Sequence, residues 1–332
     1  MSISRPFRFS AVIDQARPQA SQNLLYADDS FSHNVGSEQP WSRDGWAAKA
    51  HRVEDLGYTS FLVADHPWLD VAPVPGLMMV ADTTSLRIGS FVFNTDIRHP
   101  TLLAKDIAML DVLSNGRFEC GLGCGAIMDD YTQTGIPFER PGARVSRFEE
   151  ALCIIKRFFT EETVNFPGEY YQVTGLQGHP KPLQKPHPPI YIGGGNKRML
   201  SLAAREANCV GITAKSTPKG VDWISATPEA LLEKVAWVRD AAGDRFDQLE
   251  IGTPLFVIVP TEDRLGTAQH MAGRFGLTPE QLLSCTHMLI GTTDQMVEEL
   301  LLRREQYGMS SIAVIEAGLE ALAPVVARLT GK

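Results

Sequence analysis

A histidine and an aspartate stand side by side just after a short apolar segment, where a buried strand would end. The segment Ser60–Ala64 reads SFLVA and is followed by Asp65-His66-Pro67-Trp68. Only histidine changes its charge near neutral pH without a large perturbation, so His66 is the candidate acid or base. Asp65 could hold a hydrogen bond to a substrate or cofactor, or the pair could instead cap a helix or anchor a loop. Trp68 is a candidate wall of a substrate pocket, or a packing residue.

A run of glycines follows another candidate strand and directly precedes a helical pattern. Gly193-Gly194-Gly195-Asn196 comes after the apolar residues PIYI. Glycines let the backbone approach a ligand closely, and a helix N-terminus offers free N–H groups with a partial positive charge. We therefore expect Gly194, Gly195 and Asn196 to bind an anion such as a phosphate, with Lys197 or Arg198 assisting. The alternative is a turn needed only for tight packing of strand against helix.

A second glycine-rich segment, GLGCG at residues 121–125, suggests a dinucleotide site only weakly. It lacks the final spaced glycine of the GxGxxG pattern and does not follow the first strand. At the end of a barrel strand, however, such small residues would let a flat ring lie against the backbone.

Short strand-like segments alternate with helical patterns along the whole chain. Eight segments read as strands: Phe7–Asp14, Ser60–Ala64, Arg87–Phe93, Phe118–Gly123, Pro189–Gly193, Cys209–Thr213, Glu250–Val259 and Ser311–Ile315. Eight strands, each followed by a helix, predict an α/β protein with one (β/α)8 TIM-barrel domain over residues 1–332. The rival, an open doubly wound sheet, usually has fewer strands and a glycine-rich turn after the first strand. Because barrel enzymes carry their sites at the C-terminal ends of the strands, the candidate residues would meet there.

Two segments interrupt this alternation and are interpreted as insertions at the C-terminal face. Residues 15–40 are polar and loop-like, and residues 163–189 contain a hairpin-like VNFPGEYYQVTG and a proline-rich connector. Long loops without secondary structure are uncommon and often functional. We expect the first to be a substrate lid, with a disordered insertion without a role as the alternative.

Composition excludes several classes of protein. The 332 residues are 44% hydrophobic and 21% charged, with a net charge of −8 and no block of Lys or Arg, so nucleic acid is not an expected partner. The first residues lack an apolar leader and no apolar run approaches 18 residues, so we expect a cytoplasmic protein without a membrane span. Five cysteines without a CxxC pair predict free thiols and no metal site.

The chain resembles the bacterial-luciferase-like flavin and deazaflavin oxidoreductases, particularly the branch that uses coenzyme F420. The segments that carry the resemblance are VEDLGYTSFLVADH (53–66), LRIGSFVFNTDIRHPTLLAKDIAMLDVLSNGRFECGLGCG (86–125), GIPFERPGARVSRFEEAL (135–152) and PPIYIGGGNKRMLSLAAREA (188–207). They cover most of the chain from Trp46 to Gly211 and are more specific for the superfamily than for one cofactor. The resemblance implies a barrel that holds the ring of a flavin or deazaflavin at the strand ends.

The resemblance also assigns roles to residues. Ser90-Phe91 would form a bulge in the third strand, often with a non-proline cis peptide, behind the ring. Asn94 would bond the ring edge, and Cys124 and Gly125 would line it. Gly194-Gly195-Asn196 would hold the cofactor phosphate, and Asp65 and His66 would contact the ring or substrate.

One departure limits the assignment of a substrate. Sugar-phosphate dehydrogenases of the family carry a catalytic Glu after the glycine turn of the fourth predicted strand, whereas this chain has Ala126. We expect Ala126 and Trp68 to line the substrate pocket. Sugar oxidation needs an acid as well as a base, so the substitution argues against that reaction.

The function expected from these residues is an F420H2-dependent oxidoreductase. Hydride would pass between the deazaflavin and a C=C, C=N or carbonyl of a small organic metabolite, with His66, or a water that it holds, supplying the proton. An FMN-dependent monooxygenase working with a separate reductase is the alternative, and a non-catalytic flavin-binding protein is the third. The resemblance further implies a homo-oligomer, most simply a dimer.

Overall fold

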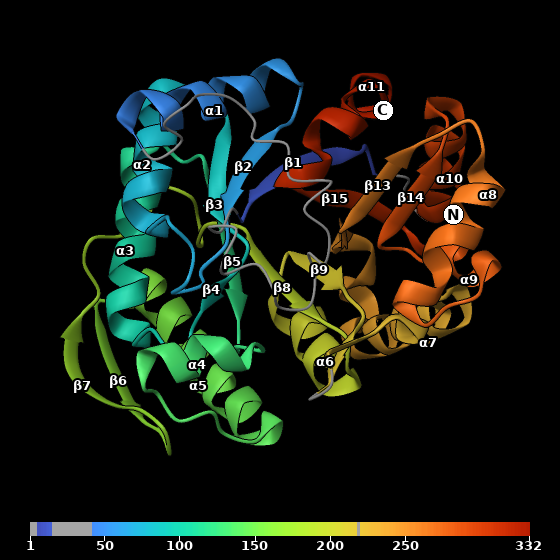
Figure 1. The fold of residues 1–332 in the computed structure, drawn as a ribbon. Coiled ribbons are helices and arrows are strands. Elements are labelled where there is room, and N and C mark those ends of the chain that lie inside the picture. The colour runs from blue at the N-terminus through green and yellow to red at the C-terminus, as the bar shows by residue number, and fades with distance from the viewer. Residues whose placement is uncertain (1–4, 15–41, 218–219) are drawn as a thin grey trace.

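The computed structural model describes residues 5–14, 42–217 and 220–332, so the predicted lid at residues 15–40 lies outside the described residues. Eight parallel strand positions close into a barrel with helices around it (Figure 1). The order around the sheet is β3-β2-β1-β15-β12-β9-β8-β5-β4, and pairing of β3 with β5 closes the ring. This confirms the predicted (β/α)8 barrel.

The elements of the barrel follow the predicted alternation closely. The barrel strands are β1 (Arg8–Ile13), β2 (Ser60–Val63), β3 (Arg87–Ser90), β4 (Phe93–Asn94), β5 (Phe118–Gly123), β8 (Ile190–Gly194), β9 (Cys209–Ile212), β12 (Glu250–Leu255) and β15 (Met309–Ile315). The helices are α1 (Arg43–Asp55), α2 (Pro73–Thr83), α3 (Pro100–Leu113), α4 (Met128–Thr134), α5 (Pro141–Thr160), α6 (Lys197–Glu206), α7 (Pro228–Ala242), α8 (Arg264–Met271), α9 (Pro279–Ser284), α10 (Thr293–Tyr307) and α11 (Leu319–Leu329).

Local sequence signals set the ends of these helices. The His99 side chain caps α3 by accepting from the Thr101 N–H, and Pro100 stands at the first helical position, where its missing N–H costs nothing. At the other end, Asn115 and Gly116 take positive φ angles and stop the helix. These signals are local, because each acts within a few residues of the helix end.

Two of the predicted strands are each split in the structure. The predicted strand Arg87–Phe93 is divided into β3 and β4 around a cis peptide between Phe91 and Val92. The predicted strand Glu250–Val259 ends in the barrel at Leu255. Its last part becomes β13 (Val257–Pro260), which pairs in parallel with β14 (Met288–Gly291) outside the barrel. A run of β-branched residues cannot by itself show which sheet each half joins.

An insertion between the seventh and eighth barrel strands was not recognised from the sequence. It comprises β13, α8, α9 and β14 and is stabilised by a second apolar cluster that includes Leu277, Leu282 and Met288. The hairpin β10 (Lys215–Thr217) and β11 (Gly220–Asp222), which follows β9, contributes Val221 to the same cluster. Several barrel positions therefore carry more structure than a single helix.

The predicted hairpin within residues 163–189 is present as β6 (Thr163–Pro167) and β7 (Gln172–Gln177), paired antiparallel. This segment joins the end of α5 to the start of β8, so it is attached at the N-terminal end of the strands and not, as the sequence predicted, at the C-terminal face. The hairpin lies beside α5, and its turn is fixed by the Glu150 carboxylate, which accepts the N–H groups of residues 169–171 at 2.8–3.1 Å. The Tyr171 ring thereby contacts His99, at the start of α3.

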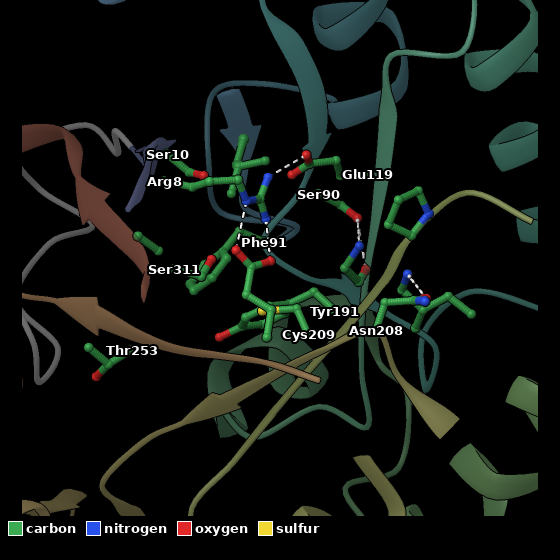
Figure 2. A pocket seen from close by; sticks show the side chains of 16 residues that line it. Arg8, Ser10, Ser90, Phe91, Glu119, Tyr191, Asn208, Cys209, Thr253 and Ser311 are labelled. Carbon is green, nitrogen blue, oxygen red and sulfur yellow. Dashed lines mark hydrogen bonds and ion pairs between the residues drawn. The ribbon is translucent and has the colours of Figure 1, made fainter. Parts of the chain in front are cut away.

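The interior of the barrel is unusually polar at its N-terminal end. The Arg8 guanidinium donates to Glu119 at 2.7 Å and to both oxygens of Glu250 at 2.8 Å. Figure 2 shows Arg8 directed toward Glu119. A cavity of about 60 Å³ is lined by these residues and, among others, by Tyr191 and Phe91. Barrel interiors are usually filled by branched apolar side chains, so this charged layer is a departure from the norm.

The glycines of β5 are required by the bent third strand. A Cβ at Gly121 would lie 2.0 Å from the Ser90 carbonyl oxygen, and one at Gly123 would lie 2.6 Å from a Val92 methyl carbon. The Ser90 hydroxyl also donates to the Gly121 carbonyl at 2.8 Å and accepts its N–H at 3.1 Å. The glycines of GLGCG therefore let two strands approach closely, which is a packing role that the sequence did not reveal. Among the described residues, no helix is long and apolar enough to span a membrane.

We predict that Gly121→Ala destabilises the fold by about 3 kcal/mol, the upper end of the range for overpacked cores, because the new methyl would meet a backbone oxygen that cannot move aside. Urea denaturation followed by circular dichroism measures the effect. Gly142→Ala is the matched control, since Gly142 is exposed in the first turn of α5 and no atom lies within 4 Å of the place that an added Cβ would take. Equal stability of the two variants would contradict the packing role of Gly121.

Candidate active site

His66 and Asp130 form a hydrogen-bonded pair at the C-terminal end of the barrel. His66 follows β2, and Asp130 lies on α4, which follows β5. The imidazole Nδ1 is 3.0 Å from each carboxylate oxygen. Asp130 is 1% exposed, whereas the His66 side chain is 26% exposed. With Nδ1–H donated to the carboxylate, Nε2 is the nitrogen left to exchange a proton with a bound molecule.

Trp68 belongs to the same group of side chains. Its indole Nε1 donates to Asp130 Oδ1 at 3.0 Å, and its ring stacks on the His66 ring at a centroid distance of 4.9 Å. His66 and Trp68 were predicted from the sequence, but Asp130 was not. Asp130 is distant from both in the sequence, and only the fold of the segment between β5 and α4 brings it to them at the C-terminal end of the barrel. The signal that could have indicated Asp130 is the pair of consecutive aspartates, Asp129 and Asp130, shortly after the glycines of β5.

Asp65 is held by protein groups. Its carboxylate accepts two hydrogen bonds of 2.6 Å from Arg98 and one of 3.1 Å from the Asn94 N–H. Asp65 is 4% exposed, and this geometry corresponds to the loop-anchoring alternative of the sequence analysis rather than to an open ligand contact. The Arg98 guanidinium, in turn, ties the loop after β4 to the end of β2.

The Asn94 side chain has one buried N–H group without a hydrogen-bond partner among the described residues. Its Oδ1 accepts the Asp96 N–H at 3.0 Å, which fixes the orientation of the amide. Its Nδ2 is buried and has no hydrogen-bond partner among the described residues. An unpaired buried donor costs free energy, so such a group at a strand end marks a position where a ligand acceptor would be favourable.

The bend at the third barrel strand lies one peptide later than the resemblance implies. The cis bond joins Phe91 to Val92 instead of Ser90 to Phe91. The Phe91 ring lies 5.1 Å from the Tyr191 ring and lines the interior cavity shown in Figure 2. Ser90 is buried in contact with Gly121, so its hydroxyl is used between strands.

The turn after β5 is covered by Tyr131 of α4. A Cβ at Gly125 would lie 1.8 Å from the Tyr131 hydroxyl oxygen, and Gly125 has a φ of 69°. That hydroxyl donates to Asp96 at 2.8 Å, and burial raises the pKa of Tyr131. Cys124 is half-buried here, where burial raises the pKa of its thiol, and Ala126 is exposed on the loop before α4.

The glycine run after β8 is explained in part by packing. A Cβ at Gly195 would lie 2.6 Å from the Ala214 carbonyl oxygen, and one at Gly194 would lie 2.7 Å from the Met199 side chain. Asn196 is the exposed N-cap of α6 and makes no side-chain capping bond. Arg198 is engaged by Ser146 and Glu149 of α5, each at 2.9 Å. The run thus serves packing, while the N-terminal N–H groups of α6 still face an exposed surface at the same end of the barrel.

A surface cleft elsewhere on the chain is a weaker candidate for a site. It is lined by residues such as Lys156, Lys185 and Arg245 around the end of α6, away from the strand C-termini. The Arg245 guanidinium donates to the Ala204 and Ala207 carbonyls and Lys156 to Glu206, so these cations stabilise the helix end. The group around His66 is the better candidate because it lies where barrel enzymes carry their sites.

Asp14 is a further titratable group at the mouth that the sequence analysis did not single out. It follows β1, and burial together with the charge of Glu316 raises its pKa from 3.8 to about 8. Glu316 follows β15, the neighbour of β1 in the barrel, and forms a buried ion pair with Lys49 of α1.

A closed barrel with titratable side chains gathered at the C-terminal strand ends defines an α/β-barrel protein with one candidate active site. A family model described as luciferase-like monooxygenase matches residues 32–265. The chain therefore belongs to the luciferase-like monooxygenase family, in agreement with the resemblance drawn from the sequence.

Individual relatives are more distant. An F420-dependent glucose-6-phosphate dehydrogenase of Kineococcus radiotolerans is 30% identical over 187 residues, which cover 54% of each chain. The chain thus spans about half the length of this curated relative. The F420-dependent tetrahydromethanopterin reductase of Methanopyrus kandleri superimposes with a TM-score of 0.69 at 16% identity, over 98% of this chain and 100% of that one. The long-chain alkane monooxygenase LadA gives 0.73 at 14% identity, over 98% and 92%. At these identities the structures establish the fold alone.

We predict that Asp14→Asn gains stability relative to the parent protein as the pH rises from 4 to 8. In the parent, folded Asp14 keeps its proton up to about pH 8 while the unfolded chain releases it near 3.8, so rising pH favours unfolding across this window. Asparagine cannot ionise, and above pH 8 the difference levels off. Urea midpoints at several pH values measure it. Asp240→Asn, at an exposed position of α7, serves as control, and a difference that is independent of pH would show that Asp14 ionises normally.

Proposed function

We propose that this protein is an oxidoreductase that uses a deazaflavin or flavin cofactor, with F420 favoured, and transfers hydride to or from a small organic molecule. The observation that carries the proposal is the His66–Asp130 pair at the C-terminal mouth of the barrel. Membership of the luciferase-like family supports the flavin-type chemistry. Two relatives, the dehydrogenase and the methanopterin reductase, are F420-dependent enzymes, which supports F420 as the cofactor.

The residues at the mouth fit a flavin-type ring. Asn94 Nδ2, a buried donor that lacks a partner among the described residues, would bond a polar atom at the ring edge. Cys124 and Gly125 would lie beside the ring, and the bend around Ser90 and Phe91 would support its back. At the other end of the cofactor, Gly194, Gly195 and Asn196 would hold the phosphate at the N-terminus of α6.

When bound, the reduced cofactor supplies the hydride, which is chemistry that protein side chains do not provide. The protein's contribution is to hold the substrate and to move a proton. His66 Nε2 would give a proton to the substrate atom that becomes negative as the double bond is reduced, and the imidazole would return to its neutral form. Asp130 keeps Nδ1–H bonded throughout, so the imidazole does not have to reorient between the two states. Arg98 and Asp65 hold the loop after β4 against β2.

The substrate of the dehydrogenase relative is not part of the proposal. Ala126, in the turn after β5, offers no carboxylate. Asp130 lies beside that turn but is already bonded to His66 and Trp68. A single proton donor suits the reduction of an unsaturated group better than the oxidation of a sugar, which needs an acid and a base.

An FMN-dependent monooxygenase is the second candidate, because the family description and the alkane monooxygenase neighbour both name a monooxygenase. The two candidates differ in cofactor and in oxygen consumption, so binding separates them first.

We predict that the apoprotein binds F420 more tightly than FMN, and that Asn94→Ala weakens the binding of the preferred cofactor about tenfold because a hydrogen-bond donor is lost. Titration of each cofactor's fluorescence measures both. The stability of apo Asn94→Ala should fall only slightly, by about 1 kcal/mol for the bond to the Asp96 N–H. A preference for FMN would favour the monooxygenase, and no binding of either would overturn the cofactor site.

We predict that His66→Ala lowers turnover with the bound cofactor by about 10²–10⁴-fold, the usual range for the loss of a general acid, without weakening cofactor binding to the same degree. His51→Ala is the control, because His51 is an exposed histidine of α1. Steady-state rates with a panel of unsaturated compounds provide the measurement. Unchanged turnover in the His66 variant would remove its proposed role, and a parent protein that binds cofactor without any turnover would be a binding protein.

A further inference from the structure

Trp68 makes two different contacts to the His66–Asp130 pair, one to each residue. Its indole N–H is directed to Asp130 Oδ1 at 3.0 Å. Its ring faces the His66 ring with an interplanar angle of 15° and a centroid distance of 4.9 Å. Trp68 is half-buried, and a rotation of its side chain would break both the bond to Asp130 and the stack on His66.

The two contacts act on different parts of the same unit. Asp130 Oδ1 receives one bond from Trp68 and one from His66, while Oδ2 lies 3.0 Å from His66 Nδ1. The indole N–H therefore fixes the plane of the carboxylate, and the carboxylate fixes the imidazole. The stacked ring covers one face of the imidazole, and the bond to Asp130 engages Nδ1, so Nε2 is the ring nitrogen left to meet a bound molecule. Rigid support of this kind is what places a proton donor within reach of its target.

The contacts also join the turn after β2 to helix α4, which is about 60 residues away in the sequence. Trp68 belongs to the turn after β2, where the Leu69 N–H bonds the His66 carbonyl at 3.1 Å, and Asp130 belongs to α4. The neighbouring Asp65 carboxylate is engaged by Arg98, so among the described residues it does not compete for the imidazole. Trp68 and Asp130 are thus the partners that the structure gives to His66.

We propose that Trp68 is a positioning residue for His66, acting through Asp130 and by stacking, rather than a wall that recognises the substrate. The proposal rests on the proposed function for its catalytic consequence, but the arrangement itself can be tested without cofactor or substrate. A stacked, protonated imidazole quenches indole fluorescence more than a neutral one does, so Trp68 reports the charge of the ring beside it.

The first experiment follows the tryptophan emission of the apoprotein from pH 5 to pH 9. Subtracting the emission of Trp68→Phe from that of the parent isolates Trp68, and we expect a single step that is absent when His66→Gln is present in both proteins. Asp130→Asn should change the size of the step, because it removes the carboxylate that holds both the imidazole and the indole N–H. The control is Trp237→Phe on α7, which should leave the step unchanged. No step, or a step that persists with His66→Gln, would overturn the stacked arrangement.

The second experiment measures kcat and KM of the cofactor-loaded enzyme. We expect Trp68→Phe to lower kcat about tenfold with little change in KM, since it keeps an aromatic face but loses the N–H to Asp130. Trp68→Leu, which loses both contacts, should lower kcat further and shift the pH profile. A rise in KM with kcat unchanged would show instead that Trp68 is a substrate wall. If no turnover is found with any substrate, the proposed function fails, while the fluorescence result still decides whether Trp68 positions His66.

Discussion

The contact on which the rest of the site depends is the close approach of the bent third strand to β5. Ser90, at the end of β3, bonds Gly121 in both directions, and the backbone after it turns at the Phe91–Val92 peptide before β4 resumes. The distances from Gly121 and Gly123 to their neighbours leave no room for a side chain at either position. Because barrel interiors are packed to the density of crystals, this approach requires glycines on β5.

The position of Asn94 and the loop beyond it follows from that contact. Asn94 ends β4, and its main-chain N–H is held by Asp65 at the end of β2. Arg98 closes the same link from the other side, so the second and third strand positions are tied together at the mouth. The effect is to fix an amide whose Nδ2 has no protein acceptor in the described part of the chain, which is a poor arrangement for stability and a good one for holding a ligand.

A second group of contacts crosses the mouth from the loop after β2 to α4. The Asp130 carboxylate accepts hydrogen bonds from His66 and Trp68. The hydroxyl of the next residue, Tyr131, lies over Gly125 and donates to Asp96. This short helix therefore supplies both the carboxylate that orients the His66 imidazole and the phenol that covers the turn after β5. Buried carboxylates are costly unless their oxygens are hydrogen-bonded, and here both oxygens of Asp130 have donors.

The amino-acid sequence was sufficient to predict the fold class, the number of barrel strands and the strand ends that carry His66, Asn94 and the glycine turns. Those signals are local: a buried β-branched run, a proline at a helix start and a glycine past its end act within a few residues. The partners of these strand ends, in contrast, became known only from the folded chain. Asp65 is bound by Arg98, and His66 is hydrogen-bonded to Asp130. The GLGCG glycines pack against Ser90 and Val92. Residues 257–260 pair with β14 outside the barrel. Each of these pairings joins residues that are distant in the sequence, because closing a barrel brings the ends of separate strands to one rim, and no spacing within the chain records which side chains meet there.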